Sequence, residues 1–356
     1  MAEPVDWELA RRVAHRVARR EQIPMAEHGY MLLPDFVEFT AQAEDLVADT
    51  TGLRSNAGPA RARVADRTQW VDANIASFQR LLRPLLDKMG DKMTSGWLSP
   101  VGRRVAAVEM GGLLGWMSTR VLGQYDLLVI EDENPEEQDL VYYVGPNVLA
   151  LERKFAFPTD EFRLWLALHE VTHRAQFTGV PWLREHFLEL INRTLDAVDP
   201  DPQRFIDGMK RMVEIRRQGG DPLADGGVAA LVASPEQRDV LDEIAGMMSL
   251  LEGHGDVTMD RAGADLIPSA DRFGRVLRNR RNSAKGMVKL FQRLIGLDAK
   301  IQQYAQGEAF IAAVETAGGT ELLDRAWEGP EALPSIQEIR DPDQWIERMQ
   351  SAVAPL

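Results

Sequence analysis

Two histidines that lie four residues apart could bind one metal ion together. The stretch Ala167–Phe177 reads "ALHEVTHRAQF" and contains His169, Glu170 and His173. In a helix, residues four apart are separated by about 40° around the axis, so both imidazoles project from one face. Two imidazoles placed in this way can hold one tetrahedral Zn²⁺ ion. We therefore expect a zinc site at this helix.

Glu170 follows the first histidine and suits a different role. It lies about 100° round the helix from His169, too far to share the ion but well placed beside a water molecule on it. A carboxylate there can act as the general base that takes a proton from water as the water attacks a carbonyl. This is the H-E-x-x-H pattern of zinc metallopeptidases. The alternative is an ordinary helix with two hydrogen-bonded histidines and no metal.

A catalytic zinc ion needs a third protein ligand, and one downstream stretch offers it. Residues 247–260 read "MMSLLEGHGDVTMD" and place Glu252 and Asp256 four apart, on a face that continues into apolar residues. A buried carboxylate is costly unless a cation compensates it. We expect Glu252 to complete the site and Asp256 to support it by accepting the N–H of a ligating imidazole.

Two further residues remain open as alternatives. His254 lies about 200° from Glu252 in a regular helix, so the two should not bind the same ion together. Gly253 and Gly255 could distort that helix, which keeps His254 as the rival third ligand or as a proton donor. Tyr304 could polarise a substrate carbonyl beside the zinc, or it is a buried, hydrogen-bonded tyrosine.

The elements that must position these residues are mostly helical by their periodicity. A helix that begins at Thr159 or Asp160 carries His169, with further helices expected at 6–20, 35–50, 68–90, 100–122, 235–259 and 294–315. Only 125–130 and 140–145 are β-rich, and we expect them to form a hairpin, after which "GPN" (145–147) turns the chain. The prediction is a mainly α fold with a small β-hairpin or sheet, of the α+β class.

Length and composition set further bounds. A chain of 356 residues can form one large domain (1–356) or two coupled subdomains, about 1–180 and 181–356. Cysteine is absent, which excludes disulfides and thiolate metal sites and is compatible with the cytoplasm, where we expect the protein. The net charge of −14 argues against a nucleic-acid partner. No stretch predicts a signal peptide or a membrane span.

Several segments together resemble one known family. "VDWELA", "VLGQYDLLV", "VGPNVLALE", "HEVTHRAQFTGVPWLREH", "LLEGHGDVTMD" and "GLDAKIQQYAQGEAFI" are similar to the zincin-like metallopeptidase family of actinobacteria and relatives, often labelled deazaflavin-cofactor-biosynthesis-associated. "HEVTH" followed by "EGHGD" also resembles the gluzincin arrangement. The resemblance implies a zincin-like fold, a zinc ion on His169 and His173, Glu170 as base, and a third ligand in the "EGHGD" block.

We therefore expect a zinc-dependent hydrolase, a metallopeptidase that acts on a peptide or protein substrate. The alternative is a non-catalytic helical binding or scaffold protein with a structural or vestigial zinc site. In zincins an edge strand near the active-site helix commonly binds extended peptide, and "LVYYVG" (140–145) is either such a strand or a core strand. Nothing in the sequence indicates a deazaflavin or nucleotide site.

Overall fold

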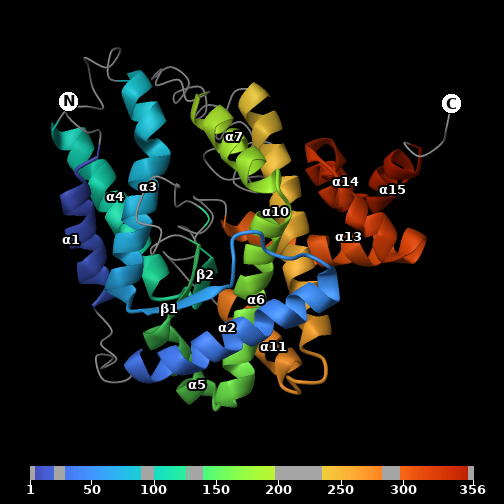
Figure 1. Ribbon diagram of the computed structural model, residues 1–356. Coiled ribbons are helices and arrows are strands. Elements are labelled where there is room, and N and C mark those ends of the chain that lie inside the picture. Colours follow the sequence, from blue (N-terminus) through green and yellow to red (C-terminus); the bar gives the residue numbers. More distant parts are fainter. Residues whose placement is uncertain are drawn as a thin grey trace. The chain divides into compact units, whose positions relative to one another are not determined.

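The computed structural model describes residues 5–19, 29–89, 100–125, 127, 139–196, 235–282 and 297–351. These residues are mainly helical and include one three-stranded sheet (Figure 1), which confirms the predicted α+β class. The chain divides into two compact units. The first consists of Met1–Gly179 and Thr258–Phe273, and the second of Val180–Val257 and Gly274–Leu356.

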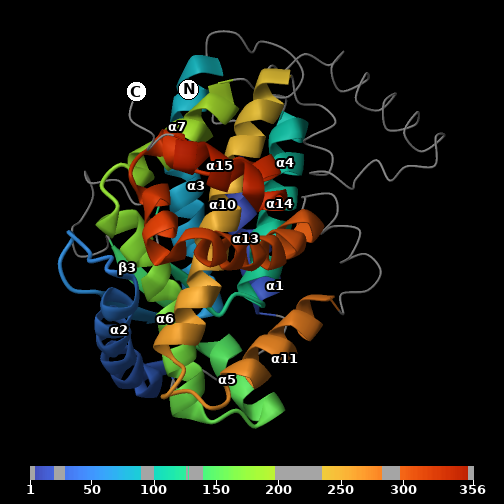
Figure 2. The ribbon, with the colours of Figure 1, turned by 90° about the vertical axis from the view of Figure 1, so that its right-hand side faces the viewer.

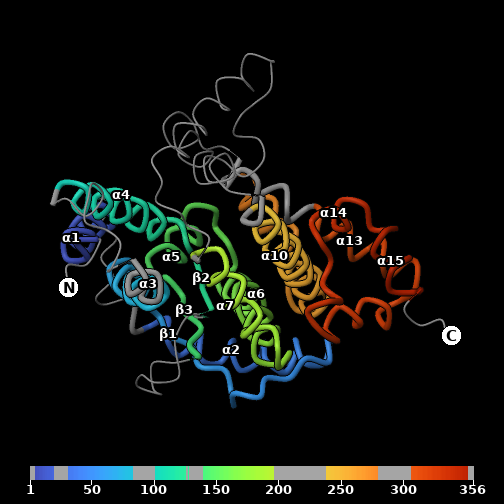
Figure 3. The backbone as a smooth tube through the Cα atoms, turned by 90° about the horizontal axis from the view of Figure 1, so that it is seen from above, coloured from blue at the N-terminus to red at the C-terminus, as the bar shows by residue number. Residues whose placement is uncertain are grey.

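The first unit contains the sheet and six complete helices. The helices are α1 (Trp7–Ala18), α2 (Gly29–Thr51), α3 (Arg67–Met89), α4 (Pro100–Ser118), α5 (Gly145–Phe155) and α6 (Thr159–Gly179). The strands are β1 (Arg61–Ala65), β2 (Gly123–Tyr125) and β3 (Leu140–Val144). Helices α1 and α4 lie side by side (Figure 3).

The described residues of the second unit are mainly helical and include no strand. It contains α7 (Leu183–Asp196), most of α10 (Pro235–Ala262), α13 (Leu297–Asp324), α14 (Ile336–Arg340) and α15 (Pro342–Ser351), with α11 (Ala270–Asn282) shared between the units. Helices α10 and α13 cross closely (Figure 2). A Cβ atom added at Gly253 would lie only 2.4 Å from the carbonyl carbon of Gly307, so glycine at this position allows the close approach. Within the described ranges, none of the helices is long and apolar enough to cross a membrane.

Strand β3 lies in the middle of the sheet, whose order is β1-β3-β2. It pairs in parallel with β1 and antiparallel with β2. Of the predicted first strand of the hairpin, 125–130, Tyr125 belongs to β2 and most of the rest lies outside the described residues. All five residues of β3 are buried. Since both of its edges are occupied, β3 is a core strand and cannot bind a peptide by strand addition. The predicted turn at 145–147 is wrong: α5 begins there, because Pro146 has the fixed φ angle that suits a first helical turn.

Helix α6 is held in the first unit by a buried arginine that follows the second histidine. Arg174 is 1% exposed, and its guanidinium donates to both carboxylate oxygens of Asp139 at 3.0 and 2.7 Å. It also donates to Glu44 at 2.7 Å and to the carbonyl of Gly58 at 2.6 Å. Burial alone would lower the pKa of Arg174, but the bonds to Asp139 and Glu44 outweigh it and raise that pKa.

A second buried arginine holds the first half of α6. Arg163 donates to the two carboxylate oxygens of Glu152 in α5 at 2.8 and 2.9 Å, and also to Asp35 in α2. Charge-assisted bonds with this paired geometry fix orientation as well as adding energy. Helix α6 is therefore tied at both ends to neighbouring elements of its own unit.

Candidate metal centre

His169 and His173 project from the same face of α6, one turn apart. Their ring centroids are 4.7 Å apart and the ring planes meet at 85°. Both side chains are half-buried. Helix α6 spans Thr159–Gly179 without interruption, so this spacing follows from the regular helix geometry around the two residues.

The side chain of Gln176 holds the ring of His173. Nδ1 of His173 lies 3.0 Å from Oε1 of Gln176, and Gln176 is fully buried. With its proton on Nδ1, the neutral imidazole donates this hydrogen bond and keeps the lone pair of Nε2 for a metal ion. Sequence reasoning missed Gln176, although its position three residues after His173, on the same helix face, is a signal that could have found it.

Glu170 lies on the sheet side of α6 and is only 6% exposed. The backbone N–H of Tyr125 in β2 donates to its Oε2 atom at 3.1 Å. Tyr143 of the central strand is close enough to be affected by its charge: burial raises the pKa of Tyr143, and the carboxylate of Glu170 raises it further, against the hydrogen bond with Thr40. Tyr143 is therefore a neutral phenol near the carboxylate of Glu170.

The downstream acids and His254 occupy different sides of α10. The helix runs unbroken through Gly253 and Gly255, so Glu252 and Asp256 share one face and both are half-buried. His254 is 7% exposed, and its ring packs edge-on against Trp327, with centroids 5.1 Å apart. The two glycines do not bring His254 round to the face of Glu252.

One group among the described residues could hold a metal ion: His169, His173 and Glu252. Each offers one ligand atom, and these atoms all lie within 4.8 Å of one another. Two imidazole nitrogens and one carboxylate oxygen are a donor set that suits Zn²⁺. The residues therefore fit a zinc ion in number and in chemistry.

Tyr304 lies in α13, but its side chain is outside those that the structure describes. Residues 271–293 form a segment rich in arginine and lysine. Within it, Arg272 donates to the carbonyls of Phe155 and Ala156 and lies over the ring of Phe157. Arg272 therefore caps the end of α5, whereas residues 283–293 of the segment lie outside the described residues.

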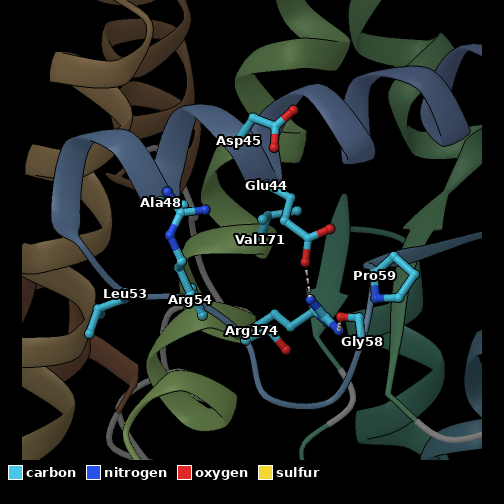
Figure 4. A pocket seen from close by; sticks show the side chains of 11 residues that line it. Glu44, Asp45, Ala48, Leu53, Arg54, Gly58, Pro59, Val171 and Arg174 are labelled. Carbon is cyan, nitrogen blue, oxygen red and sulfur yellow. Dashed lines mark hydrogen bonds and ion pairs between the residues drawn. The ribbon is translucent and has the colours of Figure 1, made fainter.

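A small cavity lies against α6 in the first unit (Figure 4). Its volume is ≈ 280 Å³, and α6 contributes Val171, Arg174 and Ala175 to its lining. These three residues are centred about 180° round the helix from His169 and His173. The cavity is therefore separate from the metal centre, and its buried charge, Arg174, is already paired with Glu44 and Asp139.

Comparisons with known proteins agree with the family that the sequence resembles. A family model described as "Zincin-like metallopeptidase" matches residues 5–346. A crystal structure of a "putative hydrolase with a novel fold" from Chloroflexus aurantiacus is 34% identical, with a TM-score of 0.72 over 97% of this chain and 99% of that chain. No curated protein matches the chain significantly.

Proposed function

Because the chain belongs to the zincin-like metallopeptidase family, we propose that it is a zinc-dependent hydrolase that cleaves peptide bonds. The ligands in this proposal are His169, His173 and Glu252, and the general base is Glu170. The single observation that carries it is the grouping of two imidazoles and one carboxylate within 4.8 Å, beside a glutamate on the same helix.

Each residue has a distinct role in the proposed reaction. The bound zinc ion would supply a Lewis acid that polarises the scissile carbonyl and acidifies water. Glu170 takes the proton from the attacking water and then delivers it to the leaving amide nitrogen, so one carboxylate acts first as base and then as acid. Gln176 keeps the ring of His173 in the tautomer that presents Nε2.

The number of protein ligands favours a catalytic over a structural zinc ion. Structural sites are closed by four protein ligands, whereas catalytic sites keep a position for water. The group has three members among the residues that the structure describes. A non-catalytic scaffold remains the competing hypothesis, and it makes the opposite prediction for peptide hydrolysis.

Metal analysis and a peptide-library assay test the proposal together. We expect one zinc ion per chain in the wild type and in Glu170→Gln, but peptide hydrolysis only in the wild type. His15→Ala is the matched histidine control. The His15 ring bonds to Asp72 at 2.9 Å and is not among the proposed ligands, so this substitution should leave zinc content and hydrolysis unchanged. A metal-free wild type, or a fully active Glu170→Gln, would contradict the proposal.

A further inference from the structure

The backbone of strand β2 surrounds the carboxylate of Glu170 on two sides. On one side, the N–H of Tyr125 donates to Oε2 at 3.1 Å. On the other, Gly123 lies so close that a Cβ atom there would be 2.5 Å from Oε1, 2.6 Å from Cγ and 2.8 Å from Cδ of Glu170. Real Cβ atoms do not approach heavy atoms this closely, so any side chain at residue 123 would displace the carboxylate.

The glycine at this position is explained by space and not by backbone conformation. Gly52, Gly58 and Gly319 adopt positive φ angles, which favour glycine, but Gly123 does not. It lies in a strand, where glycine is unfavourable because it loses more conformational freedom than other residues. A strand glycine with ordinary φ often marks a place where another group approaches closely, and here that group is Glu170.

Strand β2 cannot easily move away from an added methyl group. Its residues Gly123 and Tyr125 pair with Tyr143 and Val141 of the central strand. The Tyr125 ring also stacks on Phe177 of α6, with centroids 6.5 Å apart. Since the strand is held from both directions, the flexible side chain of Glu170 is the part that must give way.

We propose that Gly123 is a positioning residue for Glu170, leaving the space in which the carboxylate is held by the Tyr125 N–H. Its catalytic consequence rests on the proposed function, since Glu170 is the base only if the protein is a hydrolase. The contact itself does not depend on that function and has its own measurement.

The first measurement is the kinetics of Gly123→Ala. A base displaced by about 1 Å should lower kcat by about 10²-fold, whereas zinc content and KM should stay close to wild type because none of the three ligands moves. Gly112→Ala is the matched control. Nothing lies within 4 Å of a Cβ atom at Gly112, so the activity of this variant should equal that of the wild type. A folded, zinc-loaded Gly123→Ala with wild-type kcat would overturn the proposal.

The second measurement is a stability cycle on the metal-free protein, combining Gly123→Ala with Glu170→Ala. The single Gly123→Ala change should lower the melting temperature by about 2–4 °C, because the displaced carboxylate leaves the Tyr125 N–H without its acceptor. In the Glu170→Ala background the methyl group has room, so it should cause no further drop. Equal drops in both backgrounds would overturn the proposal. An inactive wild type with the expected coupling would overturn only the proposed function.

Discussion

Nδ1 of His173 lies 3.0 Å from Oε1 of Gln176, three residues later on the same helix. This bond fixes which nitrogen carries the proton and how the ring is turned. Groups that orient a ligating imidazole in this way are worth about 10–100-fold in metal affinity. The amide of Gln176 is therefore part of the proposed metal centre although it would not touch the ion.

Replacing Gln176 by alanine should weaken zinc binding by about 10–100-fold, because the ring of His173 is no longer oriented. Gln176→Glu keeps an acceptor and should bind zinc at least as well as the wild type. Competition with a chromogenic chelator measures both affinities. Equal affinities for Gln176→Ala and the wild type would show that the bond has no influence on the metal.

Glu252→Ala and His254→Ala distinguish the two candidates for third ligand. Loss of Glu252 should abolish tight zinc binding, because two imidazoles alone leave the ion under-coordinated. Loss of His254 should leave zinc bound and instead lower stability, because the ring packs on Trp327. Zinc stoichiometry after dialysis separates the two, and the reverse pattern would transfer the ligand role to His254.

Arg174→Met should destabilise the protein by about 3–5 kcal/mol, because it leaves the carboxylates of Asp139 and Glu44 without their buried partner. Arg193→Met is the matched control. Its ion pair with Glu243 is exposed, so its loss should cost less than about 1 kcal/mol. Urea unfolding of the two variants measures both losses of unfolding free energy. Similar losses would show that burial does not make the Arg174 ion pairs stronger than the exposed one.

Stability should depend on pH through Glu338 in the second unit. Burial alone would raise the pKa of Glu338, but hydrogen bonds from Arg348 and Ser335 outweigh it and lower that pKa below 4.5. A lowered folded-state pKa adds stability above 4.5, which is lost as the pH falls through the folded value.

Glu338→Gln should therefore be about 1 kcal/mol less stable than the wild type at neutral pH, because charge-assisted bonds become neutral ones. The difference should close as the pH falls below 4.5. Melting temperatures of both proteins across this range measure it, with exposed Glu347→Gln as the control. A gap that widens on acidification would contradict the assigned sign.

Periodic features could be predicted from the sequence, and features that depend on distant contacts could not. The helix of His169 and the helix of Glu252 follow from local patterns of apolar residues and capping signals. Strand β1 could not be predicted in this way, because its sequence "RARVA" lacks the run of β-branched residues typical of a strand. It is a strand because it pairs with β3, about eighty residues later.

The same limit applies within the candidate site. The spacing of His169, Glu170 and His173 is local, so their placement on one helix could be predicted from the sequence. The contact between Gly123 and Glu170 joins residues from a strand and a helix that are far apart in the sequence, so no pattern around either residue indicates it. For the same reason, the sequence could not decide whether 140–145 is an edge strand or a core strand. The position of a strand within its sheet depends on partners that are not adjacent in sequence.

The two buried arginines of α6 also decide how the protein should respond when its metal is removed. Small zinc domains unfold without the ion, because ion binding supplies their folding energy. Here Arg163 and Arg174 tie both ends of the histidine-bearing helix to α5, α2 and Asp139 by bonds that need no metal. The helix that carries both histidines is thus held within its own unit without the ion, and we expect Co²⁺ to replace zinc in the native protein without refolding.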